Sequence, residues 1–277
     1  MSGTISVIGF DSAWTDNPKS RGAISVLRSA GDGAWQLIEV RPATFSEAKE
    51  CVERETAFSK LRIVAIDQPT IVPNATGGRP VEKVAASVIG WVGGGVQPAS
   101  RRKHAMFGDG APIWRFKDEL EVSDDAIAAR DATVGTFLIE VFPALSLPSF
   151  EPAFCRRLGR PRYNPKGRRF SLGDWQRVAL CGRATASAYR VAGAEEWLEA
   201  RSMLVSPRKT DQDQLDAMLC ALIAVVWISG DRSRSIQIGD QQSGYMVALA
   251  SSAIRDRLTA SARRHGVPID GIAAASR

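Results

Sequence analysis

The sequence predicts one α/β domain, and three observations indicate this class. Short, strongly apolar segments typical of buried strands alternate with longer segments of helical periodicity. Hydrophobic residues make up 44% and charged residues 24% of the 277 residues, near the averages of ordinary globular proteins. The chain is about 1.8 times as long as a ~150-residue domain, but neither an internal repeat nor a low-complexity linker divides it.

The first quarter of the chain predicts a three-stranded meander, a helix and a further strand. The predicted strands are residues 4–10, 22–27, 35–40 and 62–66. The first is apolar at nearly every position, as expected of a central strand that is covered on both faces. Ser46 is expected to cap a helix that ends near Phe58. Pro69, shortly after the strand at 62–66, is expected to stop this strand from continuing.

The remaining sequence predicts another strand, several helices and a small edge hairpin. The predicted helices are residues 79–91, a short segment capped by Ser123, and residues 171–182, 194–201, 210–228 and 252–264. The strand is expected at 136–142, and the hairpin at 236–238 and 245–249.

These elements predict a single domain over residues 1–249, followed by a C-terminal helix and tail at 250–277. A Gly/Pro-rich insertion at about 92–122 resists assignment and is the segment most typical of a substrate-facing loop. A second insertion, at about 148–170, is basic and interrupted by prolines.

Composition excludes several classes of protein. The four cysteines lie far apart without a CxxC pair, which excludes a zinc cluster built from cysteine alone and favours reduced, buried thiols. The two histidines exclude a metalloprotease of the HExxH type. The longest strongly apolar stretch, residues 217–228, is well short of the ~20 residues of a membrane helix. The N-terminus also lacks the features of a signal peptide, so we expect a cytoplasmic protein without membrane contact.

The net charge of +6 is concentrated in the second half of the chain. Residues 1–140 carry 16 basic and 18 acidic side chains, whereas residues 141–277 carry 20 and 12. The densest cluster has no acid among its members, which are Arg156, Arg157, Arg160, Arg162, Lys166, Arg168 and Arg169. Such a cluster is typical of a site for a phosphate-bearing partner, and a solvated basic loop is the alternative.

Acidic residues stand at or near the ends of the apolar strands. Asp11 and Asp67 directly follow two of these strands, and Glu140 interrupts a third. The carboxyl ends of strands line the ligand crevice of an open α/β sheet. Asp213 and Asp216 open the long apolar helix with a spacing of i, i+3, which places them on one face. Carboxylates that converge repel one another unless a cation compensates them, and oxygen ligands suit Mg²⁺ or Mn²⁺.

Each acid also has a structural interpretation. Asp11 and Asp67 would serve equally as turn residues that bond nearby amides. Glu140 would serve as the partner of a buried arginine, because an unpaired buried glutamate is costly. Asp213 fits a capping box with Thr210, whereas Asp216 lies deeper in the helix, where capping does not explain it.

Four motifs together resemble one known family. They are IGFD at 8–11 with the strand GAISVL after it, VAIDQP at 64–69, GTFLIEVFPALS at 135–146 and DQDQLDAMLCAL at 211–222. Their order and spacing, over roughly residues 4–249, resemble the family catalogued as domain of unknown function 429, which is grouped with predicted nucleases of the ribonuclease H-like fold. The opening of the last motif is also similar to the DxxDA segment of Holliday-junction resolvases.

This resemblance implies a fold and a set of site residues. The fold is a ribonuclease H-like mixed five-stranded sheet, with three antiparallel strands first, helices on both faces, insertions and a C-terminal helix. Matching positions give the acids that bind Mg²⁺ or Mn²⁺ as Asp11, Asp67, Asp213 and Asp216. They also give Glu140, Arg79, Lys166 and Arg177 as further functional positions. The sequence departs from the family at 85–87, where a second arginine often follows the first.

The residues and the resemblance together predict a two-metal nuclease that hydrolyses phosphodiesters in nucleic acid. The catalytic residues would be Asp11, Asp67, Glu140, Asp213, Asp216 and Lys166. The substrate-binding residues would be Arg79, Arg162, Arg168, Arg169 and Arg177. A non-catalytic nucleic-acid-binding or adaptor protein on the same fold is the first alternative, and an actin- or sugar-kinase-like phosphotransferase is the second. Paired cleavage would require a homodimer.

Overall fold

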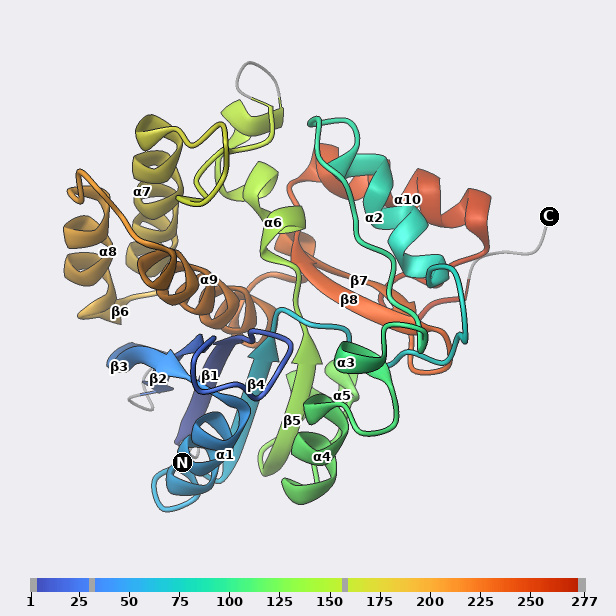
Figure 1. Cartoon of the computed structure of the whole chain (residues 1–277), viewed down its shortest axis with the longest axis horizontal. Coiled ribbons are helices and arrows are strands. Elements are labelled where there is room, and N and C mark those ends of the chain that lie inside the picture. Colours follow the sequence, from blue (N-terminus) through green and yellow to red (C-terminus); the bar gives the residue numbers. More distant parts are fainter. Residues whose placement is uncertain (1–3, 30–32, 156–158, 274–277) are drawn as a thin grey trace.

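A mixed sheet of six strands forms the centre of the part of the chain that the computed structural model describes, residues 4–29, 33–155 and 159–273 (Figure 1). Across the sheet the strands follow the order β5-β4-β1-β2-β3-β6. They are β1 (Ile5–Asp11), β2 (Gly22–Ser29), β3 (Trp35–Ala43), β4 (Leu61–Ile66), β5 (Gly135–Glu140) and β6 (Val191–Ala192). Strands β1, β2 and β3 form the predicted antiparallel meander, and β4 and β5 continue it in parallel.

The prediction of five strands was wrong by one. Strand β6 pairs in parallel with the start of β3, through Val191 with Trp35 and Ala192 with Gln36. Two residues are too few to show a periodic pattern in the sequence. Strand β6 forms because the turn after the preceding long helix brings the chain back to the edge of the meander at β3.

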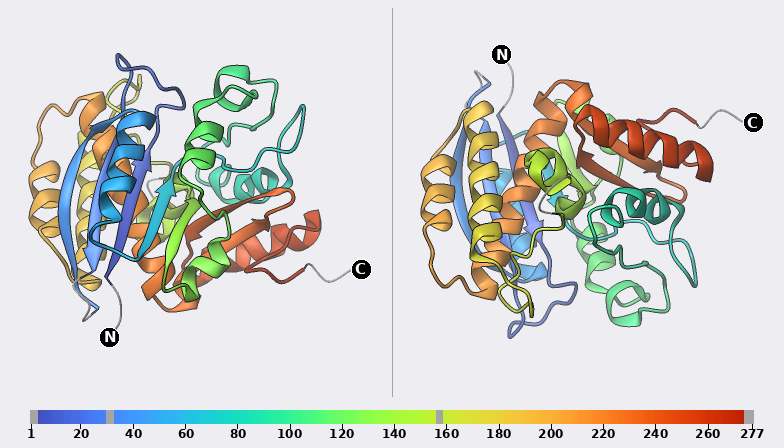
Figure 2. Two further views of the ribbon diagram at one scale, coloured as in Figure 1. Left: turned by 90° about the horizontal axis from the view of Figure 1, so that it is seen from below. Right: turned by 90° about the horizontal axis from the view of Figure 1, so that it is seen from above.

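Helices cover both faces of the sheet, as predicted (Figure 2). One face packs on α9 (Lys209–Ser229), which α7 (Leu172–Ala188) and α8 (Ala194–Ser202) flank. The other face packs on α1 (Phe45–Glu55) and α4 (Pro112–Glu119). Gly9 in β1 allows α9 to approach closely, because a Cβ there would lie 2.0 Å from the carbonyl oxygen of Ala217.

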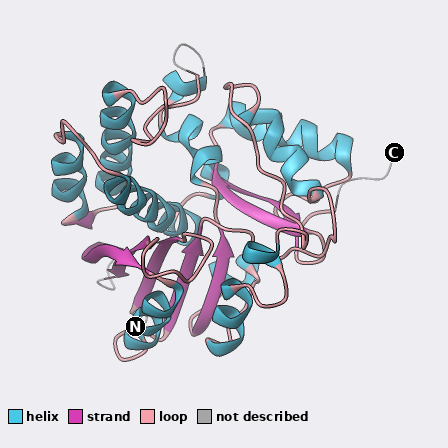
Figure 3. Cartoon of the chain, in the orientation of Figure 1, coloured by secondary structure: helices cyan, strands magenta, loops and turns pink. Residues whose placement is uncertain are grey.

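A second layer lies beside the sheet and consists of a hairpin and helices (Figure 3). Strands β7 (Ser235–Asp240) and β8 (Gly244–Leu249) pair antiparallel as predicted. They pack with α2 (Pro80–Ile89), α6 (Pro143–Phe150) and α10 (Ser252–His265) around a shared apolar cluster. The short helix η2 (Arg232–Arg234) leads into the hairpin.

The Gly/Pro-rich insertion at 92–122 contains two helices, α3 (His104–Phe107) and α4. Phe116 in α4 packs on Phe10 and Phe45, with ring centroids 6.0 and 5.6 Å away, so this insertion forms part of the core. The basic insertion contains the end of α6, the short helix η1 (Pro152–Cys155) and an irregular segment. Arg156 and Arg157 of the basic cluster lie outside the described residues.

Two predicted helix caps were wrong, and the capping box that was the alternative role of Asp213 does not form. Thr44 caps α1 through a capping box with Glu47, while the Ser46 hydroxyl bonds Asp16 instead. Asp125, and not Ser123, caps α5 (Ala126–Asp131). Helix α9 begins one residue earlier than expected, and the Asp211 side chain accepts from the Arg208 amide, so Asp213 has no capping role. In α1 and α5 the residue that stands at the N-cap accepts from the third amide of the helix.

By length and composition, α9 is the one described helix that would be able to cross a membrane. Its apolar window is 83% buried inside the protein, as expected of the central helix of a layered fold.

Candidate functional site

Three elements bring acidic residues together at one edge of the sheet. Strands β1 and β4 run parallel with Phe10 opposite Ile66, so Asp11 and Asp67, the next residues, lie at the same edge. The first turns of α9 lie over β1 and carry Asp213 and Asp216, both of which are buried. The fold therefore gathers the four acids that the sequence predicted as metal ligands.

Burial and mutual repulsion raise the pKa values of these carboxyls. Burial, followed by the charges of Asp216 and Glu140, raises the pKa of Asp67 to about 8. Burial and then the charges of Asp216, Asp67 and Asp213 hold the pKa of Asp11 well above its usual range. The pKa of Asp216 rises to about 6, mainly through burial. Two or more negative charges at this edge are therefore costly unless a cation compensates them.

Hydrogen bonds orient only part of this cluster. The Tyr163 hydroxyl donates to Oδ1 of Asp216 at 2.7 Å, and Nε2 of Gln212 donates to Oδ2 at 3.1 Å. The ammonium group of Lys209 pairs with Asp213 one turn along α9. Among the described residues, no donor hydrogen-bonds the carboxylates of Asp11 or Asp67. These two acids therefore keep their oxygen atoms available.

The chemistry of this donor set fits a divalent cation. All the candidate ligands are hard carboxylate oxygens, which suit Mg²⁺ or Mn²⁺, and a bound cation would relieve the repulsion that raises their pKa values. Within the described ranges, however, no group of three acidic, cysteine or histidine side chains stands arranged to hold a single ion. The four acids thus lie at one edge of the sheet without forming a closed group around a single point.

Glu140 and Arg79 form a buried ion pair beside the cluster. The guanidinium of Arg79 donates to Glu140 at 2.6 and 2.7 Å and to Glu82 at 3.0 Å, and its side chain has no exposed surface. The Thr70 amide adds a bond to Glu140 at 3.1 Å. Glu140 thus has the structural role that its sequence position also allowed, as the partner of a buried arginine.

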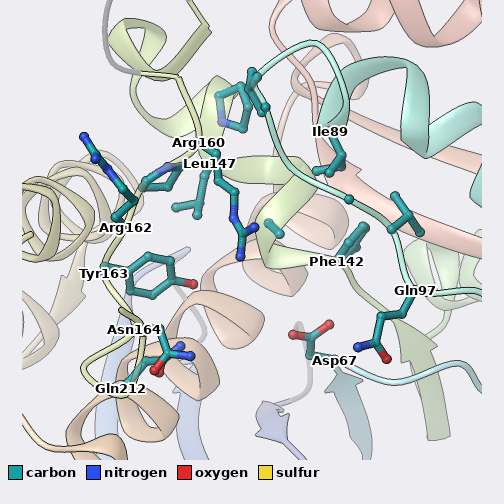
Figure 4. Close-up of a pocket in the computed structure, with 18 of the residues that line it drawn as sticks. Asp67, Ile89, Gln97, Phe142, Leu147, Arg160, Arg162, Tyr163, Asn164 and Gln212 are labelled. Carbon is teal, nitrogen blue, oxygen red and sulfur yellow. The ribbon is translucent and has the colours of Figure 1, made fainter. Parts of the chain in front are cut away.

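A cleft of about 930 Å³ opens above the acidic edge (Figure 4). Asp67 lies at the floor of the cleft, and its carboxyl group points into the cleft. Tyr163 and Gln212 also line the cleft. The basic segment forms one side, where Arg162, Arg168 and Arg169, three of the residues predicted to bind substrate, line the cleft. Lys166 and Arg177 are exposed and do not line it.

A model of the family described as protein of unknown function, DUF429, matches residues 9–241. The chain belongs to this family. Neither the curated proteins nor the solved structures contain a significant match. The family match spans all four acids and the basic segment of this DUF429 protein, so the site lies within the shared part of the chain.

Several residues of the DUF429 site were not predicted. Arg160 extends its guanidinium into the middle of the cleft and has no ion-pair or hydrogen-bond partner among the described side chains (Figure 4). Its membership of the basic cluster was the available signal. Lys209 had a weaker signal, its position four residues before Asp213. Tyr163 and Gln212 had none, because contact with Asp216 depends on the tertiary fold.

Trp14 was the tryptophan nearest in sequence to a candidate acid, and it lines the cleft of the DUF429 protein. Its indole N–H donates to the backbone carbonyl of Asp67 at 3.2 Å, and its ring packs on Phe107 at 5.5 Å. Its φ of 61° is strained for a bulky residue. The strained loop after β1 therefore braces the end of β4.

Proposed function

We propose that this DUF429 protein is a divalent-metal-dependent phosphodiester hydrolase that acts on nucleic acid. The observation that carries this proposal is the convergence of Asp11, Asp67 and Asp216, whose charges disfavour one another, at a sheet edge where Asp67 lines a cleft with arginines on one side. Clustered carboxylates favour a bound cation, and the arginines favour an anionic substrate.

The sheet supports a ribonuclease H-like interpretation of the fold. Strands β1 to β5 comprise an antiparallel meander extended in parallel by two strands, with helices on both faces. This is the arrangement that the resemblance implied, with β6 as an addition at the edge of β3.

In the proposed site, Asp11, Asp67 and Asp216 would hold the ion, with Asp213 beside them. When bound, a divalent cation supplies Lewis-acid stabilisation for negative charge on a phosphoryl group and promotes ionisation of water at neutral pH.

The residues of the chain would orient the ligands and the substrate. Tyr163 and Gln212 hold the two oxygen atoms of Asp216 in place. Arg160, with its guanidinium directed into the cleft, would bind the substrate phosphate through its planar set of donors. The ammonium group of Lys209 partly compensates the cluster, since it interacts with Asp213, Asp11 and Asp216.

The Asp11→Asn variant tests this proposal. We expect it to fold normally and to lose at least roughly 100-fold of Mg²⁺- or Mn²⁺-dependent turnover, as removal of a charge at a metal centre should. Single- and double-stranded DNA and RNA should be assayed with each metal and with EDTA. Asp118→Asn is the matched control, because Asp118 is exposed on α4. Metal-dependent turnover retained by Asp11→Asn, or no metal binding by the wild type in titration calorimetry, would contradict the proposal.

One observation favours the non-catalytic alternative. Lys209 already provides a cation near the acids, and the described residues hold no closed group of three ligands. A binding protein of this kind would bind nucleic acid with a strong salt dependence, unaffected by EDTA and by Asp11→Asn.

A further inference from the structure

The two sides of the cleft differ in chemistry. The basic side carries Arg160, Arg162, Arg168 and Arg169. The opposite side is apolar and combines α2 and the turn after it with α6 and β8. Its members are Ile89, Val92, Val96, Phe142 and Met246. Charge on one side and an apolar wall on the other are suited to a ligand with an anionic group and a flat apolar group.

The two sides of the cleft are joined at one place. The amide of Arg160 donates to the carbonyl oxygen of Val92 at 2.6 Å, so the basic segment touches the turn after α2. Gly94 packs close to the Arg160 side chain, where a Cβ would lie 3.3 Å from Cδ. The two sides of the cleft therefore meet at this point. The volume of about 930 Å³ is at the upper end of the ~300–1,000 Å³ typical of small-molecule sites.

Three glutamine side chains also line the cleft. Nε2 of Gln68 and Oε1 of Gln212 are buried and have no hydrogen-bond partner in the described structure. Both residues line the cleft, and Gln97 points toward its interior from the apolar side (Figure 4). The amide of Gln97, on the apolar side, has the donor and the acceptor that the polar edge of a nucleobase requires.

We propose that the apolar wall is a subsite for an unpaired nucleobase, so that the substrate is a single strand or a strand end and not a continuous duplex. This inference rests on the proposed function, which places the phosphate between Arg160 and the acidic edge. A base within a duplex is stacked on both faces and paired along its edge, and it must leave the stack to contact the apolar side of the cleft with its face.

Calorimetric titration in EDTA separates base binding from hydrolysis. The probes are dAMP and 2-deoxyribose 5-phosphate, which lacks the base. We expect dAMP to bind at least about 10-fold more tightly than 2-deoxyribose 5-phosphate, because contact between a base face and protein side chains adds binding free energy of this size. Val96→Ser should weaken dAMP binding at least about 3-fold and leave the sugar phosphate unchanged. Arg160→Gln should weaken both. The matched controls are Val134→Ser and Arg263→Gln, at exposed positions that do not line the cleft.

Cleavage provides the second readout. With Mn²⁺, the wild type should cleave a single-stranded oligonucleotide at least about 10-fold faster than the same sequence in a duplex. Equal binding of the two probes, no effect of Val96→Ser, or preferred cleavage of the duplex would overturn the base subsite. The hydrolase proposal would survive if metal-dependent cleavage remains. Selective dAMP binding without metal-dependent cleavage would instead support the subsite and refute the hydrolase.

Discussion

Replacing Asp67 by asparagine should stabilise the protein at neutral and alkaline pH when no divalent metal is present. The substitution keeps the shape of the side chain and removes a charge that burial, Asp216 and Glu140 disfavour. In the wild type, Asp67 has a pKa of about 8 in the folded state, against 3.8 for the ordinary group. The folded protein therefore holds a proton that the unfolded chain releases between these two values.

The sign and size of the effect follow from this difference. Below pH 4 both states are protonated, and Asp67 costs the fold nothing. As pH rises from about 4 to 8, the unfolded state is increasingly favoured, and above 8 the loss is complete. Each pH unit above the unfolded-state pKa lowers the free energy of unfolding of the wild type by about 1.4 kcal/mol. At pH 7 the ionisation of Asp67 in the unfolded state therefore destabilises the wild-type fold by up to roughly 4 kcal/mol. Since neighbouring acids relax when one charge is removed, we expect Asp67→Asn to gain about 2–4 kcal/mol at this pH.

Urea denaturation in EDTA, followed by circular dichroism from pH 4 to 8.5, measures the effect. The difference in the free energy of unfolding between Asp67→Asn and wild type should be near zero at pH 4 and should grow with pH. Addition of Mn²⁺ should stabilise the wild type through binding to the folded state and should stabilise the variant much less. Asp118→Asn should follow the wild type throughout.

Two results would refute this reasoning. A difference that stays constant from pH 4 to 8.5 would mean that Asp67 is not held in a repulsive, desolvated cluster. Equal stabilisation of wild type and Asp67→Asn by Mn²⁺ would mean that the ion binds elsewhere.

Three further variants probe the surroundings of the cluster. Arg79→Met should destabilise the fold by about 3–5 kcal/mol in urea denaturation, because it leaves Glu140 charged and buried; a loss below about 1 kcal/mol would contradict a buried ion pair. Gly9→Ala should destabilise by several kcal/mol, roughly 3 or more, because its Cβ would collide with the α9 backbone, and an unchanged thermal transition would count against this close packing. Tyr163→Phe removes a hydrogen bond that lowers the pKa of Asp216, so Mn²⁺ binding should require a higher pH, and an unshifted binding profile would exclude this role.

The sequence predicted the strands and long helices well, because their apolar patterns depend on neighbouring residues alone. Strand β6 could not be predicted, since two residues pair only after α7 has returned them to β3. Helix α4 was hidden in a Gly/Pro-rich segment, although Phe116 anchors it in the core. The wrong caps reflect competition between adjacent polar residues, as at Thr44 and Ser46.

In the candidate site, the positions of acids at strand ends could be predicted, whereas contacts between distant residues could not. Asp11 and Asp67 could be placed at one sheet edge, because each follows an apolar strand directly. The pairing of Arg79 with Glu140 joins residues 61 positions apart, and the contact of Tyr163 with Asp216 joins residues 53 apart. Such pairings depend on the packing of layers, which no local pattern encodes.

The acidic edge also has a consequence for biosynthesis. Asp11 and Asp67 belong to the first strands of the chain, whereas Asp216 arrives with α9, after three quarters of the residues have been made. Domains fold as their segments leave the ribosome, and the early strands have no cover on one face until α9 packs on β1 and β4. A nascent chain therefore cannot assemble the full set of acids before the second half of the protein is present, and any activity that depends on them begins only on the completed fold.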